Sequence, residues 1–179
     1  GSTTRSSELT TTWPMLTARN SGDRTMPNDC AVMAATHHMS LTKGTAMYEN
    51  LQAIATTEAP AALGAYSQAV KANGFVFVSG QLGIDPSTGE LDGVTAAEQA
   101  DRALKNIRHI LDAAGCGFEH VCRATIYLRN VEDFADVDAV YAKAFTATVK
   151  PARVAFGNNM IPKGALVEID VIAVSPESE

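Results

Sequence analysis

The chain has 179 residues, of which 46% are hydrophobic and 19% are charged, as is typical of a globular protein with one core. Its cysteines are odd in number and lack a CxxC spacing, which suggests neither a disulfide framework nor a zinc knuckle and favours a reducing compartment; they are Cys30, Cys116 and Cys122. The four histidines have no second ligand at helical spacing, so we expect no metal. No apolar run approaches the ~18 residues that span a bilayer, and we expect no membrane partner.

The distribution of charge argues against a nucleic-acid partner. The chain has 14 basic and 20 acidic residues, of which four basic and three acidic residues precede residue 47. Residues 47–179 therefore carry 10 basic and 17 acidic residues, a net charge of −7. Phosphate binding depends on clustered basic side chains, and it is weak at physiological salt without them.

The first 46 residues differ in composition from the rest of the chain. Residues 3–46 are rich in Ser and Thr and show no sustained period, so we predict a flexible extension over 1–46, followed by a single domain over 47–179. Gly1-Ser2 resembles the remnant of a removed tag. We expect a cytoplasmic protein. The alternative is a mitochondrial or other organelle protein, because the extension weakly resembles a transit peptide. The composition favours the simpler interpretation, a stretch that is merely disordered or that precedes a functional start at Met47.

A β-hairpin is predicted at the start of the domain. Residues 67–71 and 75–79 are strand-like, and Asn73-Gly74 between them suits a type I′ turn, which requires positive φ. Residues 85–89, DPSTG, predict a loop. Gly80 and Gly83 are too few for a phosphate-binding loop, so we interpret them as permitting a tight strand end.

Two helices are predicted further along. Thr95 and Glu98 form a capping box, and apolar residues recur at helical spacing from 100 to 114, before Gly115. Residues 121–128 predict a strand. A second helix follows, capped by Asp133, with a buried stripe of Phe134, Val137, Tyr141 and Ala144.

Two more strands, 153–156 and 165–174, complete the predicted sheet around the turn at 161–164. Helices separated by single strands imply right-handed crossovers, which place both helices on one face. The strand over 165–174 is apolar on nearly both faces, so we expect a second copy of the sheet to cover the other face.

Few residues indicate chemistry on their own. Ser79 lacks the preceding glycine of a nucleophile elbow. Arg153 opens a strand after a proline, where its position is well fixed, although most arginines are simply exposed. Glu168 fits the wet face of a half-buried strand, and Tyr66 fits packing at a strand entrance.

Four motifs change this interpretation because they occur in the order and spacing of the RidA/YjgF family, also described as the endoribonuclease L-PSP or translation inhibitor family. They are LGAYSQAV at 63–70, VSGQ at 78–81, PAR at 151–153, and IPKG with LVEI at 161–169. The resemblance covers residues 51–174. It implies a chorismate-mutase-like α+β fold of order β-β-β-α-β-α-β-β. It also implies a homotrimer whose three sheets form a central barrel, with active clefts between subunits.

The resemblance further implies an enzyme of the 2-iminobutanoate/2-iminopropanoate deaminase type, which hydrolyses imines and enamines such as 2-aminoacrylate to 2-keto acids and ammonia. No cofactor is expected, because an anchored imine carbon is already electrophilic. By resemblance, Arg153 binds the substrate carboxylate, Glu168 handles water and its proton, and Tyr66, Ser79 and Ala155 line the cleft.

The sequence also departs from the family at three positions, and two other functions stay open. Ala65 replaces a common Pro, Ala155 replaces Cys or Thr, and Asn159 replaces a small residue, which bears on substrate preference. One alternative is an endoribonuclease or translation inhibitor. The other is a non-catalytic protein that binds small metabolites or acts as a chaperone.

Overall fold

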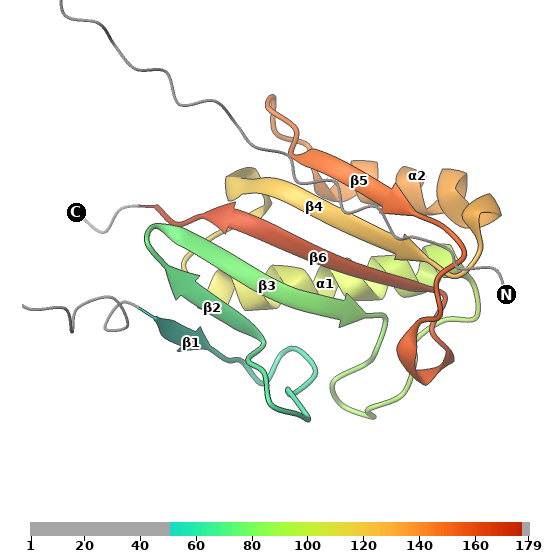
Figure 1. Ribbon diagram of the computed structural model, residues 1–179, viewed down its shortest axis with the longest axis horizontal. Coiled ribbons are helices and arrows are strands. Elements are labelled where there is room, and N and C mark those ends of the chain that lie inside the picture. The colour runs from blue at the N-terminus through green and yellow to red at the C-terminus, as the bar shows by residue number, and fades with distance from the viewer. Residues whose placement is uncertain (1–50, 177–179) are drawn as a thin grey trace, which may run out of the picture. The chain divides into compact units, whose positions relative to one another are not determined.

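The computed structural model describes residues 51–176, which form a six-stranded mixed sheet with two α-helices on one face (Figure 1). The strand order is β1-β2-β3-β6-β4-β5, with only β4 and β5 parallel. The helices are α1 (Ala96–Ala113) and α2 (Phe134–Ala144). The strands are β1 (Gln52–Ile54), β2 (Ala69–Ala72), β3 (Phe75–Leu82), β4 (Val121–Leu128), β5 (Ala152–Phe156) and β6 (Val167–Val174).

This arrangement confirms the predicted α+β fold, with both helices on the same face. Short 3-10 turns connect its elements at Phe118–His120, Val131–Asp133 and Pro162–Gly164. The predicted extension over 1–46 lies outside the described residues. Within 51–176, neither helix has the length and apolar character needed to cross a membrane.

Strands β2 and β3 form the predicted hairpin. Asn73 and Gly74 have φ values of 48° and 78°, the left-handed conformation that the type I′ turn requires. Strand β3, however, continues to Leu82, which pairs with Glu168 of β6, so the predicted strand end at Ser79 is wrong. The glycine at position 80 lies inside this strand, because β6 pairs on both sides of it.

Helix α1 begins at the predicted capping box. The Thr95 hydroxyl accepts a hydrogen bond from the Glu98 N–H at 3.2 Å, and the Glu98 carboxylate accepts one from the Thr95 N–H at 3.0 Å. The helix ends before Gly115, whose φ is 74°. Its buried apolar face contains Ala96, Ala100, Ala103, Leu104, Ile107, Ile110 and Leu111.

Helix α2 starts after Asp133 as predicted, but the Asp133 side chain does not bond to the first turn. Its carboxylate instead accepts a hydrogen bond from Asn130 Nδ2 at 3.3 Å. The predicted stripe is confirmed, since Val137 and Tyr141 are buried and the residues at its two ends pack against the core; these are Phe134 and Ala144.

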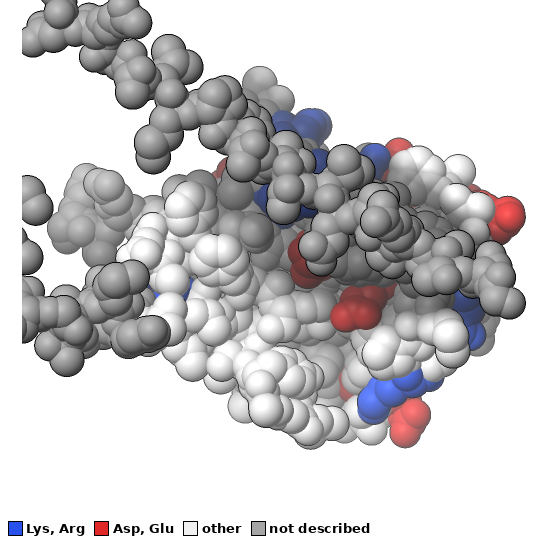
Figure 2. All heavy atoms as spheres, viewed as in Figure 1, with Lys and Arg blue, Asp and Glu red and all other residues white. Residues whose placement is uncertain are grey.

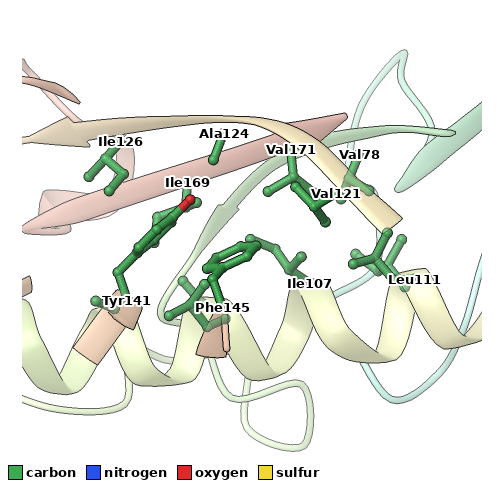
Figure 3. Packing of buried hydrophobic residues seen from close by; sticks show 14 of the residues in the cluster. Val78, Ile107, Leu111, Val121, Ala124, Ile126, Tyr141, Phe145, Ile169 and Val171 are labelled. Carbon is green, nitrogen blue, oxygen red and sulfur yellow. The ribbon is translucent and has the colours of Figure 1, made fainter. Parts of the chain in front are cut away.

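The hydrophobic core lies between the sheet and the helices. Figure 3 shows side chains of the sheet, such as Val78, Ile126 and Ile169, pointing toward Ile107 of α1 and Tyr141 of α2. Alternate residues of β6 and β4 supply this face, as the two-residue period of a strand requires. The core therefore fixes which face of each strand remains open.

The opposite face of the sheet is not covered by any described element, and it carries four exposed apolar side chains. Phe75, Phe77, Val174 and Phe156 are 41%, 45%, 45% and 49% exposed. Figure 2 views this face, and the described residues visible in it are largely white, with acidic side chains near the middle. Exposed apolar side chains on an uncovered sheet face are typical of a protein interface, as the apolar strand at 165–174 led us to expect.

One buried polar side chain ties α1 to the end of β3. Asn106 is fully buried, and its Nδ2 donates hydrogen bonds to the carbonyls of Leu82 at 3.1 Å and Ile84 at 2.9 Å. Its Oδ1 has no hydrogen-bond partner among the described residues. The side chain thus satisfies two carbonyls where β3 leaves the sheet, and it fixes the start of the β3–α1 connection.

We expect Asn106→Leu, which keeps the number and branching of the side-chain heavy atoms, to lower the free energy of unfolding by about 1–3 kcal/mol, because two buried carbonyls lose their donor. Chemical denaturation measures this change. The control is Lys105→Ala, at an exposed position of the same helix, where we expect a change within about 0.5 kcal/mol. Equal stability of Asn106→Leu and the unmutated protein would show that these bonds contribute nothing.

A candidate active-site cavity at one end of the sheet

A cavity of about 690 Å³ opens where three connections meet one end of β3 and β6. The connections are the β1–β2 segment, the β3–α1 segment and the turn before β6. The sheet contributes Ser79, Gly80, Gln81, Leu82 and Glu168, and the connections contribute Pro60, Ala61, Leu63, Tyr66, Gln68, Ile84, Pro86, Gly89, Pro162 and Lys163. The structure therefore brings together three of the five predicted site residues: Tyr66, Ser79 and Glu168.

A β-bulge shapes the floor of this cavity. Val78 pairs with Val171 and Gln81 pairs with Ile169, so two residues of β3 stand opposite Asp170 alone. A bulge bends the strand and redirects its side chains. Ser79 and Gly80 are the two residues of the bulge.

Gly80 leaves free the space that the Glu168 side chain of β6 occupies. A Cβ built at Gly80 would lie 2.1 Å from Oε1 of Glu168 and 2.9 Å from its Cδ. The absence of a side chain therefore leaves room for the Glu168 carboxyl directly over the β3 backbone. This explains Gly80 differently from the strand end that we predicted.

Glu168 lies in an environment that favours its protonated form. Partial burial raises the pKa of this carboxyl above its ordinary value, and the nearby Asp170 carboxylate raises it further. Asp170 is two positions along β6 on the same face. The carboxyl therefore keeps its proton to a higher pH than an exposed glutamate does, which suits a group that accepts and returns a proton.

Ser79 connects the bulge to β2. Its hydroxyl donates a hydrogen bond to the Ser67 carbonyl at 2.7 Å, and its N–H donates to the Gln68 carbonyl at 3.0 Å. The hydroxyl proton is thus engaged, and its oxygen can accept a further bond from a ligand in the cavity. Tyr66 is 56% exposed and forms part of the cavity wall from the β1–β2 connection.

The buried side chain of Gln68 holds the β1–β2 connection in place. Its Oε1 accepts a bond from the Thr56 N–H at 2.7 Å, and its Nε2 donates to the carbonyls of Thr56, Ala59 and Pro60 at 3.0, 3.2 and 2.8 Å. Sequence reasoning quoted Gln68 only as part of a motif and missed this role. A glutamine directly before the apolar residues Ala69 and Val70 was the available signal.

Lys163 is a second residue that the prediction of the site omitted. Its φ and ψ of 56° and 14° are left-handed, which is uncommon outside glycine, and Gly164 follows with φ of 71°. The ammonium donates to the Gly89 carbonyl at 3.4 Å and contributes a positive charge to the cavity wall. The Pro-Lys-Gly turn indicated the loop but not the direction of this side chain.

Arg153 does not line this cavity. It lies on β5, the edge strand, and pairs with Ala124 of the core, whereas Glu168 lies on the open face. The Arg153 guanidinium forms an ion pair with Asp138 of α2 and lies over the Tyr141 ring, 4.7 Å from its centroid. Burial raises the pKa of Tyr141 to about 12, so the phenol stays neutral beside this cation.

The same separation applies to Ala155, which is on β5, two residues after Arg153, and pairs with Ile126. Between β5 and β6 lies β4, so about 10 Å of sheet separates the two strands. A single chain therefore does not bring Arg153 or Ala155 to the cavity that contains Glu168.

Comparison with known proteins identifies the family. Residues 56–175 match the family described as Endoribonuclease L-PSP. The rat protein named 2-iminobutanoate/2-iminopropanoate deaminase is 47% identical over 121 residues, which cover 68% of this chain and 88% of the rat protein. The human protein of the same name is 43% identical over 121 residues, with the same coverage.

Solved structures agree with this match. Yeast Mmf1 is 34% identical, with a TM-score of 0.68, over 71% of this chain and 100% of that one. TdcF of E. coli, solved with bound serine, is 34% identical with a TM-score of 0.64 over 69% of this chain and 98% of that one. The chain belongs to the Endoribonuclease L-PSP family, which is the RidA/YjgF family that its four motifs resemble.

Proposed function

We propose that the protein hydrolyses 2-imino acids, and the enamines that tautomerise to them, to 2-keto acids and ammonia. The observation that carries the proposal is the partly buried Glu168 carboxyl, which lies over Gly80 inside a cavity and has a raised pKa. The deaminase names of the rat and human relatives support this reaction. The serine bound to TdcF shows that a related fold binds a ligand the size of an amino acid.

The chemistry requires one group that accepts a proton and returns it. The Glu168 carboxylate accepts a proton from water as the water oxygen bonds to the electrophilic imine carbon. The electron pair of the C=N bond moves to the nitrogen, which takes this proton from Glu168, and a carbinolamine forms. The carboxylate then accepts the proton of the carbinolamine hydroxyl as the carbonyl forms. The carbon–nitrogen bond breaks, and the nitrogen takes that proton and leaves as ammonia. A raised pKa brings the carboxyl closer to neutral pH, where both transfers proceed readily.

We further propose that Arg153 of a second copy supplies the carboxylate anchor, within a homotrimer. Support comes from the distance between β5 and the cavity of the same chain, and from the uncovered apolar face of the sheet. Asp138 and the rings of Phe134 and Tyr141 fix the orientation of the guanidinium. Its planar fork of N–H donors matches the two oxygens of a carboxylate.

The description of the family favours a second candidate, RNA cleavage. The net charge of −6 and the acidic side chains on the open face argue against it, because RNA affinity depends on basic clusters. Salt-dependent RNA binding would distinguish this candidate from the deaminase. A metabolite-binding protein without turnover would bind keto acids and produce no ammonia.

We expect Glu168→Gln to lower kcat at least a hundredfold, because the amide cannot accept the proton of the attacking water; general acid–base catalysis contributes roughly 10²–10⁴-fold. Keto acids should still bind, since the anchor is elsewhere. Ammonia release from freshly generated 2-aminoacrylate measures the rate, and calorimetry with pyruvate measures binding. Full activity of Glu168→Gln would remove Glu168 from the mechanism.

The pH profile and the variant Asp170→Asn test the ionisation of the Glu168 carboxyl, and the variant Gly80→Ala tests its placement. Activity should fall as the pH drops through the pKa of Glu168, at a pH above that of an ordinary glutamate, because the base must be ionised. Asp170→Asn should move this limb to lower pH by removing the neighbouring negative charge. Gly80→Ala keeps the carboxyl but displaces it, and it should lower kcat while the protein stays folded.

We expect Arg153→Ala to lower kcat/KM tenfold to over a hundredfold, because charge-assisted hydrogen bonds contribute about 1.5–3 kcal/mol. Arg153→Lys should recover only part, since an ammonium lacks the fork. Steady-state kinetics and pyruvate binding measure both effects. Hydrolysis at full rate in Arg153→Ala would refute the anchor. Keto-acid binding at Arg153 without hydrolysis in the unmutated protein would indicate a sensor.

We expect light scattering to give three times the 18.9 kDa mass of one chain. Phe77→Asp, on the open face, should give a monomer with little activity, because it places a charge in the apolar interface. Val94→Asp is the control at another exposed apolar position, 88% exposed, and it should remain a trimer. A monomeric unmutated protein at micromolar concentration would refute the shared site.

A further inference from the structure

The cavity is much larger than the smallest imino acid, whose side chain is a methyl group. Its volume of about 690 Å³ falls in the range of about 300–1,000 Å³ that encloses drug-sized ligands. The bulge residues Ser79 and Gly80 and the Glu168 carboxyl line one part of it, on the sheet. The rest of this single-chain cavity lies toward the connections, away from the Glu168 carboxyl.

The walls contributed by the connections are mainly apolar. Pro60 and Leu63 come from the β1–β2 segment, Ile84 and Pro86 from the β3–α1 segment, and Pro162 from the turn before β6. Leu63 is 82% exposed, so a ligand against it removes apolar surface from water. The polarity of the cavity thus changes from the sheet, which carries the carboxyl, to the connections, which carry hydrocarbon.

Buried hydrogen bonds fix both apolar walls. Gln68 holds the Pro60 carbonyl at 2.8 Å, and Asn106 holds the Ile84 carbonyl at 2.9 Å. A wall that is already in place requires little ordering when a ligand binds, so apolar contact contributes more directly to affinity. The space is therefore a formed part of the site.

We propose that this site prefers 2-imino acids with long or branched apolar side chains, such as those derived from leucine and phenylalanine, over the imine derived from alanine. The inference rests on the proposed function and names its substrate class. Each methylene buried against the apolar walls raises affinity about fourfold. Several buried carbons therefore give a preference well above tenfold.

The charge of Lys163 suggests a competing substrate class, 2-imino acids with an acidic side chain. Among the described residues that line the cavity, Lys163 is the only one with a cationic side chain. An acidic side chain on a substrate would pair with it. The imine derived from glutamate is one atom longer than the leucine imine and carries a carboxylate. Preference for the glutamate imine would assign the cavity to dicarboxylates and overturn the proposal.

The experiment compares imines that an amino acid oxidase generates in place from alanine, leucine, phenylalanine and glutamate, with keto acid formation as the readout. We expect kcat/KM for the leucine or phenylalanine imine to exceed that for the alanine imine at least tenfold. Equal values, or a preference for the alanine imine, would overturn the proposal.

A variant that fills the cavity tests the location. Ala61 is exposed and lines the cavity, so Ala61→Phe adds bulk there without entering the core. It should lower the ratio of leucine to alanine kcat/KM at least tenfold. The control is Ala113→Phe, the same change at an exposed position at the C-terminal end of α1, which does not line the cavity. It should leave that ratio unchanged. An unchanged ratio in Ala61→Phe would overturn the assignment.

Failure of the proposed reaction can be distinguished from failure of the proposed substrate preference. If none of the imines is hydrolysed, the reaction is wrong, and keto-acid binding then tests the inference by itself. Tighter binding of 4-methyl-2-oxopentanoate than of pyruvate in calorimetry, reversed by Ala61→Phe, would support the apolar cavity. Equal binding of the two keto acids would overturn it.

Discussion

The close contact between the Glu168 carboxyl and the β3 backbone at Gly80 determines how the candidate site is built. A side chain at position 80 would occupy the place of Oε1, so the two strands could not hold the carboxyl there. The bulge supplies the extra residue, and the glycine supplies the space. Partial burial and the Asp170 carboxylate then raise the pKa of Glu168, so the local geometry of the sheet creates the chemical property.

The residues proposed for one reaction lie on two faces of the sheet. Glu168 is on the open face, whereas Arg153 is on the helix side of the edge strand, between Asp138 and Tyr141. This division gives a physical reason for assembly, because a single chain offers the proton acceptor without the anchor. The apolar side chains of the open face provide the surface on which a second copy would pack.

The sequence predicted the local elements well and the site only through resemblance. Period, capping and turn residues located α1, β4 and the hairpin at Asn73-Gly74, because these signals depend on neighbours in the chain. Gly80 was misinterpreted as a strand end, since its partner Glu168 is far away in sequence. The hydrogen bonds of Gln68 and Asn106 were not predictable for the same reason: each depends on pairing between distant segments.

The buried hydrogen bonds of Gln68 and Asn106 also have an evolutionary consequence. They connect the cavity walls to the core, so mutations that rearrange these loops also destabilise the fold. Side chains that project from the walls, such as those of Ala61 and Leu63, can vary without this cost because they are exposed. New substrate ranges in this fold can therefore arise by single substitutions on a fixed backbone, while the Glu168 carboxyl proposed to react stays unchanged.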